Sequence, residues 1–286
     1  MTVHTPVPIR IEDIEAWRAH VGRQDIRRQR LDVESLRRFA AAQGAPLDVE
    51  RTPAPLAHWT WFLEVVGPDG IGPDGHPRRG GLMPPVTLPR RMFASADMRF
   101  LAPLSLDAPA EMSLTIAEVN HKSGKTGDLV FVEVDRALTQ DGVLRLTEHQ
   151  TIVYRDLGGP TPPVIPTDQP PHRNAQVWDP GPVDLFRFSA VTFNSHRIHY
   201  DAPYARDEEG YPGLVVHGPF TAAKLFALAE AREGRPIRRF QFRAVAPLFA
   251  GQPIYLAPGE GPGDVQALRC DGAVAMSAHA DFDLPA

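Results

Sequence analysis

Cysteine is almost absent from this chain of 286 residues, in which Cys270 is the only one. No disulfide can therefore form within the chain, and a metal site built from several cysteines is excluded. A chain with so little cysteine is typical of a reducing compartment, so we expect the protein in the cytoplasm.

Long apolar runs and a strong charge of one sign are also missing. The first residues, MTVHTPVPIRIEDIEAW, contain no apolar core long enough for a signal peptide, and His, Lys or Pro interrupts the apolar stretches elsewhere. The net charge is only -5, and the basic cluster of Arg27, Arg28 and Arg30 is too short to attract nucleic acid or an acidic membrane. The sequence therefore predicts a soluble protein that binds neither.

Proline, by contrast, is abundant, with 30 residues in all and eight of them between positions 158 and 182. Proline has no amide hydrogen and breaks both helices and sheets, so we expect this segment to be an extended connector. It divides the chain into residues 1–157, 158–182 and 183–286. With 43% hydrophobic and 23% charged residues, the composition is that of a globular protein.

Two short motifs recur in the same order on either side of the connector. RFLAPL, from Arg99, matches RAVAPL, from Arg243, and DGVLRLTEHQTI, from Asp141, matches DGAVAMSAHADF, from Asp271. Each Asp-Gly pair predicts a tight turn before a strand, and a histidine follows eight residues after each aspartate. The offset falls from 144 (99 to 243) to 130 (141 to 271), so the second copy is shorter by about a hairpin's worth of residues. We interpret the chain as a duplicated domain.

Each half combines a predicted helix with predicted strands. VESLRRFAAAQG, from Val33, has one apolar face and ends at a glycine, whereas HGPFTAAKLFALAEAREG, from His217, is apolar almost all round and must be buried. Residues 110–156 alternate apolar and polar side chains between the turn formers SGKTG and DG, which predicts an antiparallel meander. The sequence therefore predicts an α+β fold in which each half wraps a curved sheet around a helix.

The stretch FNSHRIHYD, residues 193–201, gathers polar side chains that could carry chemistry. Histidine changes its charge near neutral pH, so His196 and His199, beside Asp201, could move protons. A solvated polar loop is the alternative. The two histidines are three residues apart and no third ligand stands in register with them, so we expect no metal site.

Gly218 and Pro219 stand where the second predicted helix begins. Proline suits the first turn because it has no amide hydrogen to leave unpaired, and glycine allows another group to approach closely. The remaining amides of that turn are positively polarised and would stabilise an oxyanion. A histidine that activates water beside such amides is what the addition of water to a conjugated thioester requires.

NSHRIH, from Asn194, followed by GLVVHG, from Gly213, resembles the active-site signature of the MaoC-like double-hotdog hydratases and dehydratases, which act on acyl thioesters. Within that family the chain is most similar to a subgroup that includes mitochondrial-type 3-hydroxyacyl-thioester dehydratases and bacterial mesaconyl-CoA or itaconyl-CoA hydratases. KSGKTGDLVFVEV and PRRMFA in the first half extend the resemblance over nearly the whole chain. It implies a tandem hotdog fold with a degenerate first half that forms the acyl pocket and one active site in the second half.

The resemblance also implies roles for individual residues. In the family a histidine and an acidic partner hold and deprotonate water, and a glycine amide at the helix start binds the thioester oxygen. These roles fall on His199, Asn194 and Gly218. Because asparagine cannot act as a base, Asn194 would orient the water, and Asp201 would either share the catalytic work or cap a turn.

Four further residues are expected to contact the substrate. Arg197 could bind a CoA phosphate or a carboxylate, although a solvated arginine is the alternative. His196 lies in the same cluster, and His217 would set the geometry at the helix start. Arg91 is the cation that an anionic acyl group such as mesaconyl would need.

The expected activity is that of a hydro-lyase that reversibly hydrates a 2-enoyl thioester, with acyl-CoA such as mesaconyl-C(4)-CoA or itaconyl-CoA as substrate. We expect no metal or redox cofactor, and a homo-oligomer, in the simplest case a dimer. A hotdog thioesterase and a non-catalytic acyl-CoA-binding subunit are the alternatives, since fold alone does not fix function.

Overall fold

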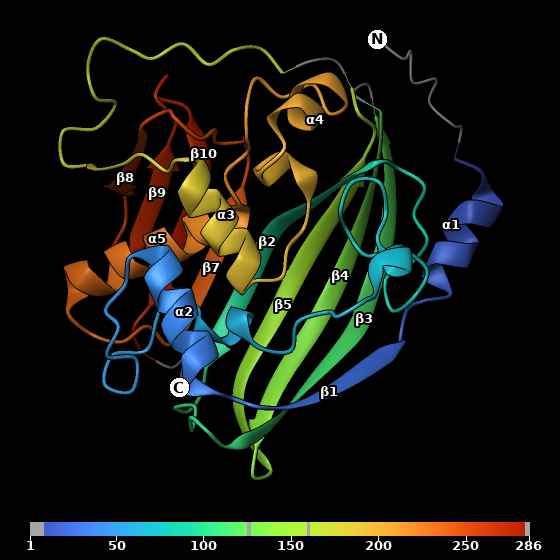
Figure 1. Ribbon diagram of the computed structural model, residues 1–286, viewed down its shortest axis with the longest axis horizontal. Helices are drawn as coiled ribbons and strands as arrows, with labels where there is room; N and C mark the ends of the chain where they lie inside the picture. The colour runs from blue at the N-terminus through green and yellow to red at the C-terminus, as the bar shows by residue number, and fades with distance from the viewer. Residues whose placement is uncertain (1–8, 125–126, 159–160, 284–286) are drawn as a thin grey trace.

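The computed structural model describes residues 9–124, 127–158 and 161–283 (Figure 1). Residues 1–8, part of the predicted turn SGKTG and two residues of the proline-rich segment lie outside these ranges, so the expectations for them stay untested. Among the described residues, no helix combines the length and the apolar character needed to cross a membrane.

One antiparallel sheet forms the framework of the described chain, and helices lie against it. Its strands are β1 (Gln24–Arg30), β2 (Arg90–Phe100), β3 (Pro109–Gly124), β4 (Gly127–Gln140), β5 (Val143–Arg155), β6 (Gln176–Trp178), β7 (Arg239–Ala244), β8 (Ile254–Pro258), β9 (Asp264–Leu268) and β10 (Val274–Asp281). The helices are α1 (Ile11–Arg18), α2 (Val33–Gln43), α3 (Pro182–Val191), α4 (Ala202–Asp207) and α5 (Gly218–Glu233), with 3-10 turns η1 (Ala57–Thr60), η2 (Pro68–Gly70) and η3 (Arg197–His199).

The strand order confirms the predicted duplication. It runs β1-β3-β4-β5-β2-β7-β10-β9-β8-β6. Outward from β2 the order is β5, β4, β3 and β1, and outward from β7 it is β10, β9, β8 and β6, so each strand has a counterpart in the other half. The two Asp-Gly turns occupy equivalent places, between β4 and β5 and between β9 and β10. The hairpin of the second copy is shortened rather than lost, because β8 and β9 have 5 residues each where β3 and β4 have 16 and 14.

The proline-rich segment is more than a connector. Its residues Gln176–Trp178 form β6, which pairs with β8 at the edge of the sheet, so the expectation that the segment would not pair was wrong here. The neighbouring prolines, Pro171 and Pro180, flank β6 without interrupting it, which an edge strand tolerates. Pro182 then opens α3, where a missing amide hydrogen costs nothing. The domain limits that the sequence predicts stay a prediction.

Both predicted helices are confirmed, with their glycine stops. α2 ends before Gly44 and α5 before Gly234, and both glycines adopt the left-handed conformation, with φ of 66° and 70°. α5 lies against the sheet of the second half and buries Phe220, Leu225 and other apolar side chains in the main core. Phe39 of α2 joins the same core. The buried α5 thereby holds its first turn, the predicted oxyanion site, inside the molecule.

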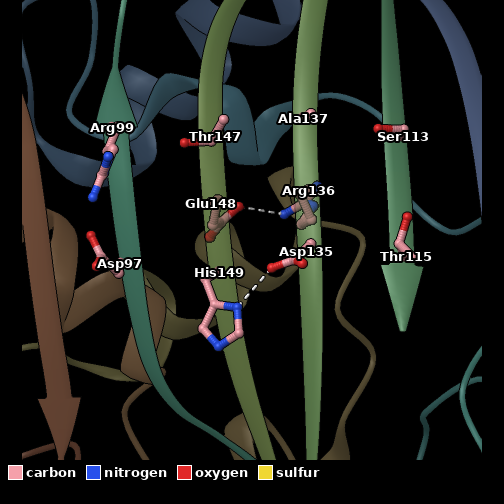
Figure 2. A pocket seen from close by; sticks show the side chains of 10 residues that line it. All are labelled: Asp97, Arg99, Ser113, Thr115, Asp135, Arg136, Ala137, Thr147, Glu148 and His149. Atoms are coloured by element: carbon pink, nitrogen blue, oxygen red, sulfur yellow. Dashed lines mark hydrogen bonds and ion pairs between the residues drawn. The ribbon is translucent and has the colours of Figure 1, made fainter. Parts of the chain in front are cut away.

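A row of polar side chains crosses the face of the sheet opposite α5. Its members, in spatial order and each the register partner of the next, are Asp135, His149, Asp97, Gln241, His279 and Asp264. We call these six residues the cross-sheet row. Figure 2 shows its first-half end, where Asp97, Asp135 and His149 line a depression of about 470 Å³. The row contains both histidines of the repeated motif.

Each histidine of the cross-sheet row lies between two carboxylates. The Nδ1 atom of His149 is 2.7 Å from Asp135, and its Nε2 atom is 3.3 Å from Glu133. Partial burial opposes protonation of His149, but the hydrogen bond to Asp135 and the two negative charges outweigh it and raise the pKa. In the second half, the hydrogen bond to Asp264 is the main cause that raises the pKa of His279.

The two halves meet in the middle of the same row. Asp97 of β2 accepts hydrogen bonds from Arg239 and Gln241 of β7, at 2.6 and 2.9 Å. Arg239 binds both carboxylate oxygens, and this bidentate contact holds the pKa of Asp97 below its usual value. The row therefore joins the duplicated halves by charge as well as by backbone pairing.

The raised pKa values of the two histidines predict a pH-dependent contribution to stability. The folded chain holds these protons more tightly than the unfolded chain, so the contribution is complete below the ordinary histidine pKa of about 6.5 and is lost as the pH rises through the folded values. Replacing both residues (His149→Gln and His279→Gln) should lower the free energy of unfolding near pH 6, by roughly 0.2–1 kcal/mol for each exposed pair, and change it little near pH 9. Denaturant titrations at the two pH values test this, and an equal loss at both would contradict it.

Candidate active site

The segment FNSHRIHYD forms a tight loop between α3 and α4. Phe193, just after α3, has a left-handed φ of 49°, and the Asn194 amide donates to the carbonyl oxygen of Ser189 at 2.9 Å. The next turn, η3, buries Ile198 and His199. The loop therefore directs its second histidine into the molecule rather than toward solvent.

His199 is held as a neutral imidazole with one nitrogen free. Its Nδ1 atom lies 2.7 Å from the carbonyl oxygen of Val215, which can only accept a hydrogen bond, so Nδ1 carries the proton and Nε2 presents a lone pair. Nε2 has no hydrogen-bond partner among the described residues. Burial, with repulsion from His196 second, lowers the pKa of His199 to about 3, although the bond to Val215 acts in the opposite direction. The ring is therefore in the form that a general base needs.

The first turn of α5 lies directly beside this histidine. The ring of His217 stacks on that of His199, with centroids 3.6 Å apart and planes 19° apart, and its Nε2 atom lies 2.8 Å from the Ser189 hydroxyl. The Gly218 amide donates to no group in the described part of the chain. A Cβ at Gly218 would meet the Phe93 carbonyl oxygen at an ordinary 3.6 Å. Packing does not require glycine here, and the absent side chain leaves the amide open to a bound group.

His196 lies next to His199 but forms a hydrogen bond with a carboxylate. Its Nε2 atom is 2.9 Å from Glu209 Oε1, and its ring meets that of His199 edge-on, with centroids 5.6 Å apart. Both His196 and Glu209 are buried. Arg90 of β2 donates to the Glu209 carbonyl oxygen, and its Nε atom lies 4.0 Å from the second carboxylate oxygen. The buried negative charge is thus paired on both sides, as such a charge must be.

The first half of the chain also reaches the site. The ring of His76 lies against that of His196, with centroids 4.0 Å apart, and its Nδ1 atom is 3.1 Å from Asp74. Burial, then the nearby charge of Arg91, lowers the pKa of His76 well below its ordinary value, so this ring is neutral. Four imidazoles therefore follow one another: His76, His196, His199 and His217.

A backbone crossing fixes this contribution from the first half. Ser195 donates its hydroxyl to the Gly75 carbonyl oxygen, and the Arg197 amide donates to the Asp74 carbonyl oxygen at 2.9 Å. Gly75 has a φ of 89°, and a Cβ on it would come within 1.9 Å of the Ser195 oxygen. Only glycine fits between the two segments.

Asp74, His76 and His196 bring potential ligand atoms within 4.8 Å of one another. The histidines of this group already donate to the carboxylates of Asp74 and Glu209, and Arg91 acts on His76 as a neighbouring cation. The arrangement therefore favours two histidine–carboxylate pairs over a cation site. The predicted absence of a metal stays a prediction.

The remaining members of FNSHRIHYD lie at the rim. Asn194 Oδ1 accepts from the His196 amide at 3.0 Å, and its NH2 group has no partner among the described residues. Asp201 caps α4 by accepting from the Tyr204 amide at 3.1 Å and pairs with Arg197 at 2.8 Å. Of the two interpretations of Asp201, the structure shows the cap. Arg197 and Asp201 form an ion pair with each other. Their roles in catalysis or substrate binding stay predictions.

Arg91 carries a charge without a carboxylate partner among the described residues. It lies on β2 opposite Tyr154 of β5, so both side chains project from the same face of the sheet. Burial raises the pKa of Tyr154, and the guanidinium of Arg91 acts against this rise. Its positive charge also acts, after burial, to lower the pKa of His76.

Two carboxylates and a histidine of this site were not predicted from the sequence. Glu209 ends the charged run ARDEE, where nothing marks it as the buried member. Asp74 and His76 lie in GPDGHP, which is typical of an exposed turn. Their only signal was a histidine next to an Asp-Gly turn, which is too common to indicate a site.

Comparison with known proteins places this geometry in a family. The family model of hydroxyacyl-thioester dehydratase type 2 matches residues 56–250. The chain is 44% identical, over 272 residues, to a mesaconyl-C(4)-CoA hydratase of Chloroflexus aurantiacus, a match that covers 92% of this chain and 96% of the relative.

Solved structures share the fold at low sequence identity. A MaoC-like dehydratase from Phytophthora capsici superposes with a TM-score of 0.64 at 16% identity, covering 95% of this chain and 99% of that one. A Mycobacterium tuberculosis protein described as a double hotdog fold gives a TM-score of 0.52 at 12% identity, covering 91% and 95%. The predicted α+β tandem hotdog fold is thereby confirmed. The matched residues include His76, the whole of FNSHRIHYD and the start of α5, and the chain belongs to the hydroxyacyl-thioester dehydratase type 2 family.

Proposed function

We propose that this chain is a hydro-lyase that reversibly adds water to the double bond of a 2-enoyl-CoA thioester. The observation that carries the proposal is the neutral His199, with Nε2 free, beside the unpaired Gly218 amide at the start of α5. One group can take a proton from water, and the other can hold the oxygen on which charge develops.

The proposed reaction uses these groups in a fixed order. Asn194 orients a water molecule, and His199 Nε2 takes one of its protons while the water oxygen bonds to the β-carbon. The electrons of the double bond move through the α-carbon onto the thioester oxygen, where the Gly218 amide and the positive end of α5 stabilise the enolate. A proton then returns to the α-carbon and restores the thioester. No electron leaves the substrate, so we propose no redox cofactor. The Gly218 amide and the positive end of α5 take the place of an electrophilic metal at the thioester oxygen, so we propose no metal either.

We further propose that the acyl group carries a free carboxylate, as mesaconyl-C(4)-CoA or itaconyl-CoA does. The 44% identical relative is named for the first of these substrates. Arg91 supports the proposal, since a partly buried guanidinium without a carboxylate partner among the described residues is costly unless a ligand pairs with it.

We also propose a cytoplasmic homodimer. The single cysteine supports the compartment. The sheet ends in β1 and β6, where Ile26 and Val177 expose 46% and 64% of their surface, and such edges can pair with a second copy.

Removing the proposed base should stop the reaction. We expect His199→Ala to leave the absorbance of an enoyl-CoA unchanged over hours. The other unpartnered imidazole nitrogen beside Gly218, Nδ1 of His217, is buried away from solvent, and burial lowers the pKa of that ring well below its ordinary value, so it is a poor substitute for the base. His149→Ala, on the opposite face of the sheet, is the control and should hydrate at the wild-type rate. Turnover by His199→Ala would contradict the assignment, and release of free CoA thiol by the wild type would indicate a thioesterase instead.

Blocking the oxyanion site should lower the rate without unfolding the chain. In Gly218→Ala the added Cβ has room within the protein but occupies the approach to the amide, so we expect kcat to fall about a hundredfold at an unchanged melting temperature. Stopped-flow hydration assays and thermal denaturation measure the two quantities. A wild-type kcat, or a loss of rate that follows a loss of stability, would count against the proposed role.

Arg91 should decide between substrates. We expect Arg91→Gln to raise KM for a dicarboxylic enoyl-CoA about 10- to 100-fold, as the loss of a charged hydrogen bond of about 1.5–3 kcal/mol implies, and to leave crotonyl-CoA hydration unchanged. Arg99→Gln on the same strand, where the side chain is exposed, is the matched control. Equal effects of Arg91→Gln on both substrates would show that Arg91 does not bind the substrate carboxylate.

A further inference from the structure

Two neighbouring histidines of the site stand in opposite electrostatic surroundings. His199 donates to a backbone carbonyl oxygen and is otherwise surrounded by buried groups, whereas His196 donates to the carboxylate of Glu209. Their rings are 5.6 Å apart between centroids. Paired titratable groups in unlike surroundings are the usual basis of separate acid and base roles.

The addition of water needs both an acid and a base. The base takes a proton from water, and the acid gives a proton to the α-carbon when the enolate collapses. Asn194, the residue expected to orient the water, has an amide side chain that can do neither. The proton for the α-carbon comes either from His199, which has just taken one from water, or from a second residue, and Asn194 cannot be that residue.

We propose that His196, supported by the buried carboxylate of Glu209, is this second group and exchanges the proton of the α-carbon. The inference rests on the proposed hydratase function and assigns the part that Asn194 cannot play.

Each proton of the proposed step can be followed. Water gives one proton to His199 Nε2 and its oxygen bonds to the β-carbon, which leaves an enolate. The enolate carbon then takes the proton from Nδ1 of the charged His196, and the carbon–oxygen double bond re-forms. His199 is now charged and His196 neutral, and one proton passing through solvent from the first to the second restores the site. The net change is the addition of one water.

The surroundings of His196 suit this exchange. Nε2 is committed to Glu209, so Nδ1, which has no partner among the described residues, is the nitrogen left to exchange a proton. The carboxylate can stabilise a charge on the ring, as in other histidine–carboxylate pairs, and the Arg90 guanidinium lies 4.0 Å from its second oxygen. His76, on the other face of the ring, is neutral and adds no competing charge.

Other groups near the site fit the role less well. Asp201 is engaged by Arg197 and by the Tyr204 amide. His76 contacts His196 rather than His199 in the succession of rings, so it lies one residue farther from the base. Arginine does not release its proton in proteins, which excludes Arg90.

The experiment compares variants in the dehydration direction, where the α-proton must be removed. We expect Glu209→Gln to lower kcat at least tenfold with little change in KM, and His196→Asn to lower it further. With a 3-hydroxyacyl-CoA deuterated at the α-carbon, both variants should show a larger primary isotope effect on kcat than the wild type, because α-proton transfer becomes rate-limiting. A residue with a merely structural role would not raise the isotope effect.

Glu208→Gln is the matched control, since Glu208 is the exposed neighbour in the same run and should keep the wild-type rate and isotope effect. A wild-type kcat in Glu209→Gln, or a lower kcat with an unchanged isotope effect in both variants, would overturn the inference. Failure of the wild type to act on any enoyl- or 3-hydroxyacyl-CoA would instead overturn the proposed function. Circular dichroism shows that each variant is folded, and if one fails to fold the other carries the test.

Discussion

The hydrogen bond from His199 Nδ1 to the Val215 carbonyl oxygen, 2.7 Å long, is the interaction on which the site depends. It fixes the tautomer, so Nε2 carries the lone pair, in a ring that stacks on His217 at the start of α5. The Val215 amide in turn donates to the carbonyl oxygen of Ile198 at 3.0 Å, so two hydrogen bonds join the histidine loop to the segment that precedes α5. Without these two hydrogen bonds, the position of His199 relative to the Gly218 amide would not be fixed. Such positioning is what would make two weak groups effective catalysts.

The duplicated fold explains why one chain can hold a site of this kind. The β2–β7 junction and the cross-sheet row join the halves into one sheet, and α5 is buried against the other face of that sheet. The second half supplies His199 and the Gly218 amide, and the first half brings Gly75 and His76 against the histidine loop. The first half therefore contributes contacts to the histidine cluster of the second half.

Local sequence was sufficient for much of this account. The Asp-Gly turns, the glycine stops of α2 and α5 and the repeated motifs depend on neighbouring residues, and they predicted the duplicated α+β fold correctly. His199 and Gly218 could be singled out because their motif and the helix start lie close in the sequence. Glu209 and His76 could not, because burial depends on which distant segments meet: Arg90 of β2 reaches Glu209, and only the crossing at Gly75 brings His76 onto His196. The strand β6 was missed because prolines surround it without entering it.

The central claim is that His199 is a neutral imidazole protonated at Nδ1, with Nε2 free for water. Nitrogen-15 NMR of the free protein, with histidines labelled and His199 assigned by comparison with His199→Gln, tests this most directly. We expect the Nδ1–H tautomer, unchanged from about pH 8 down to about pH 5, because burial lowers the pKa of His199 to about 3. A proton on Nε2, or a charged ring near neutral pH, would contradict it.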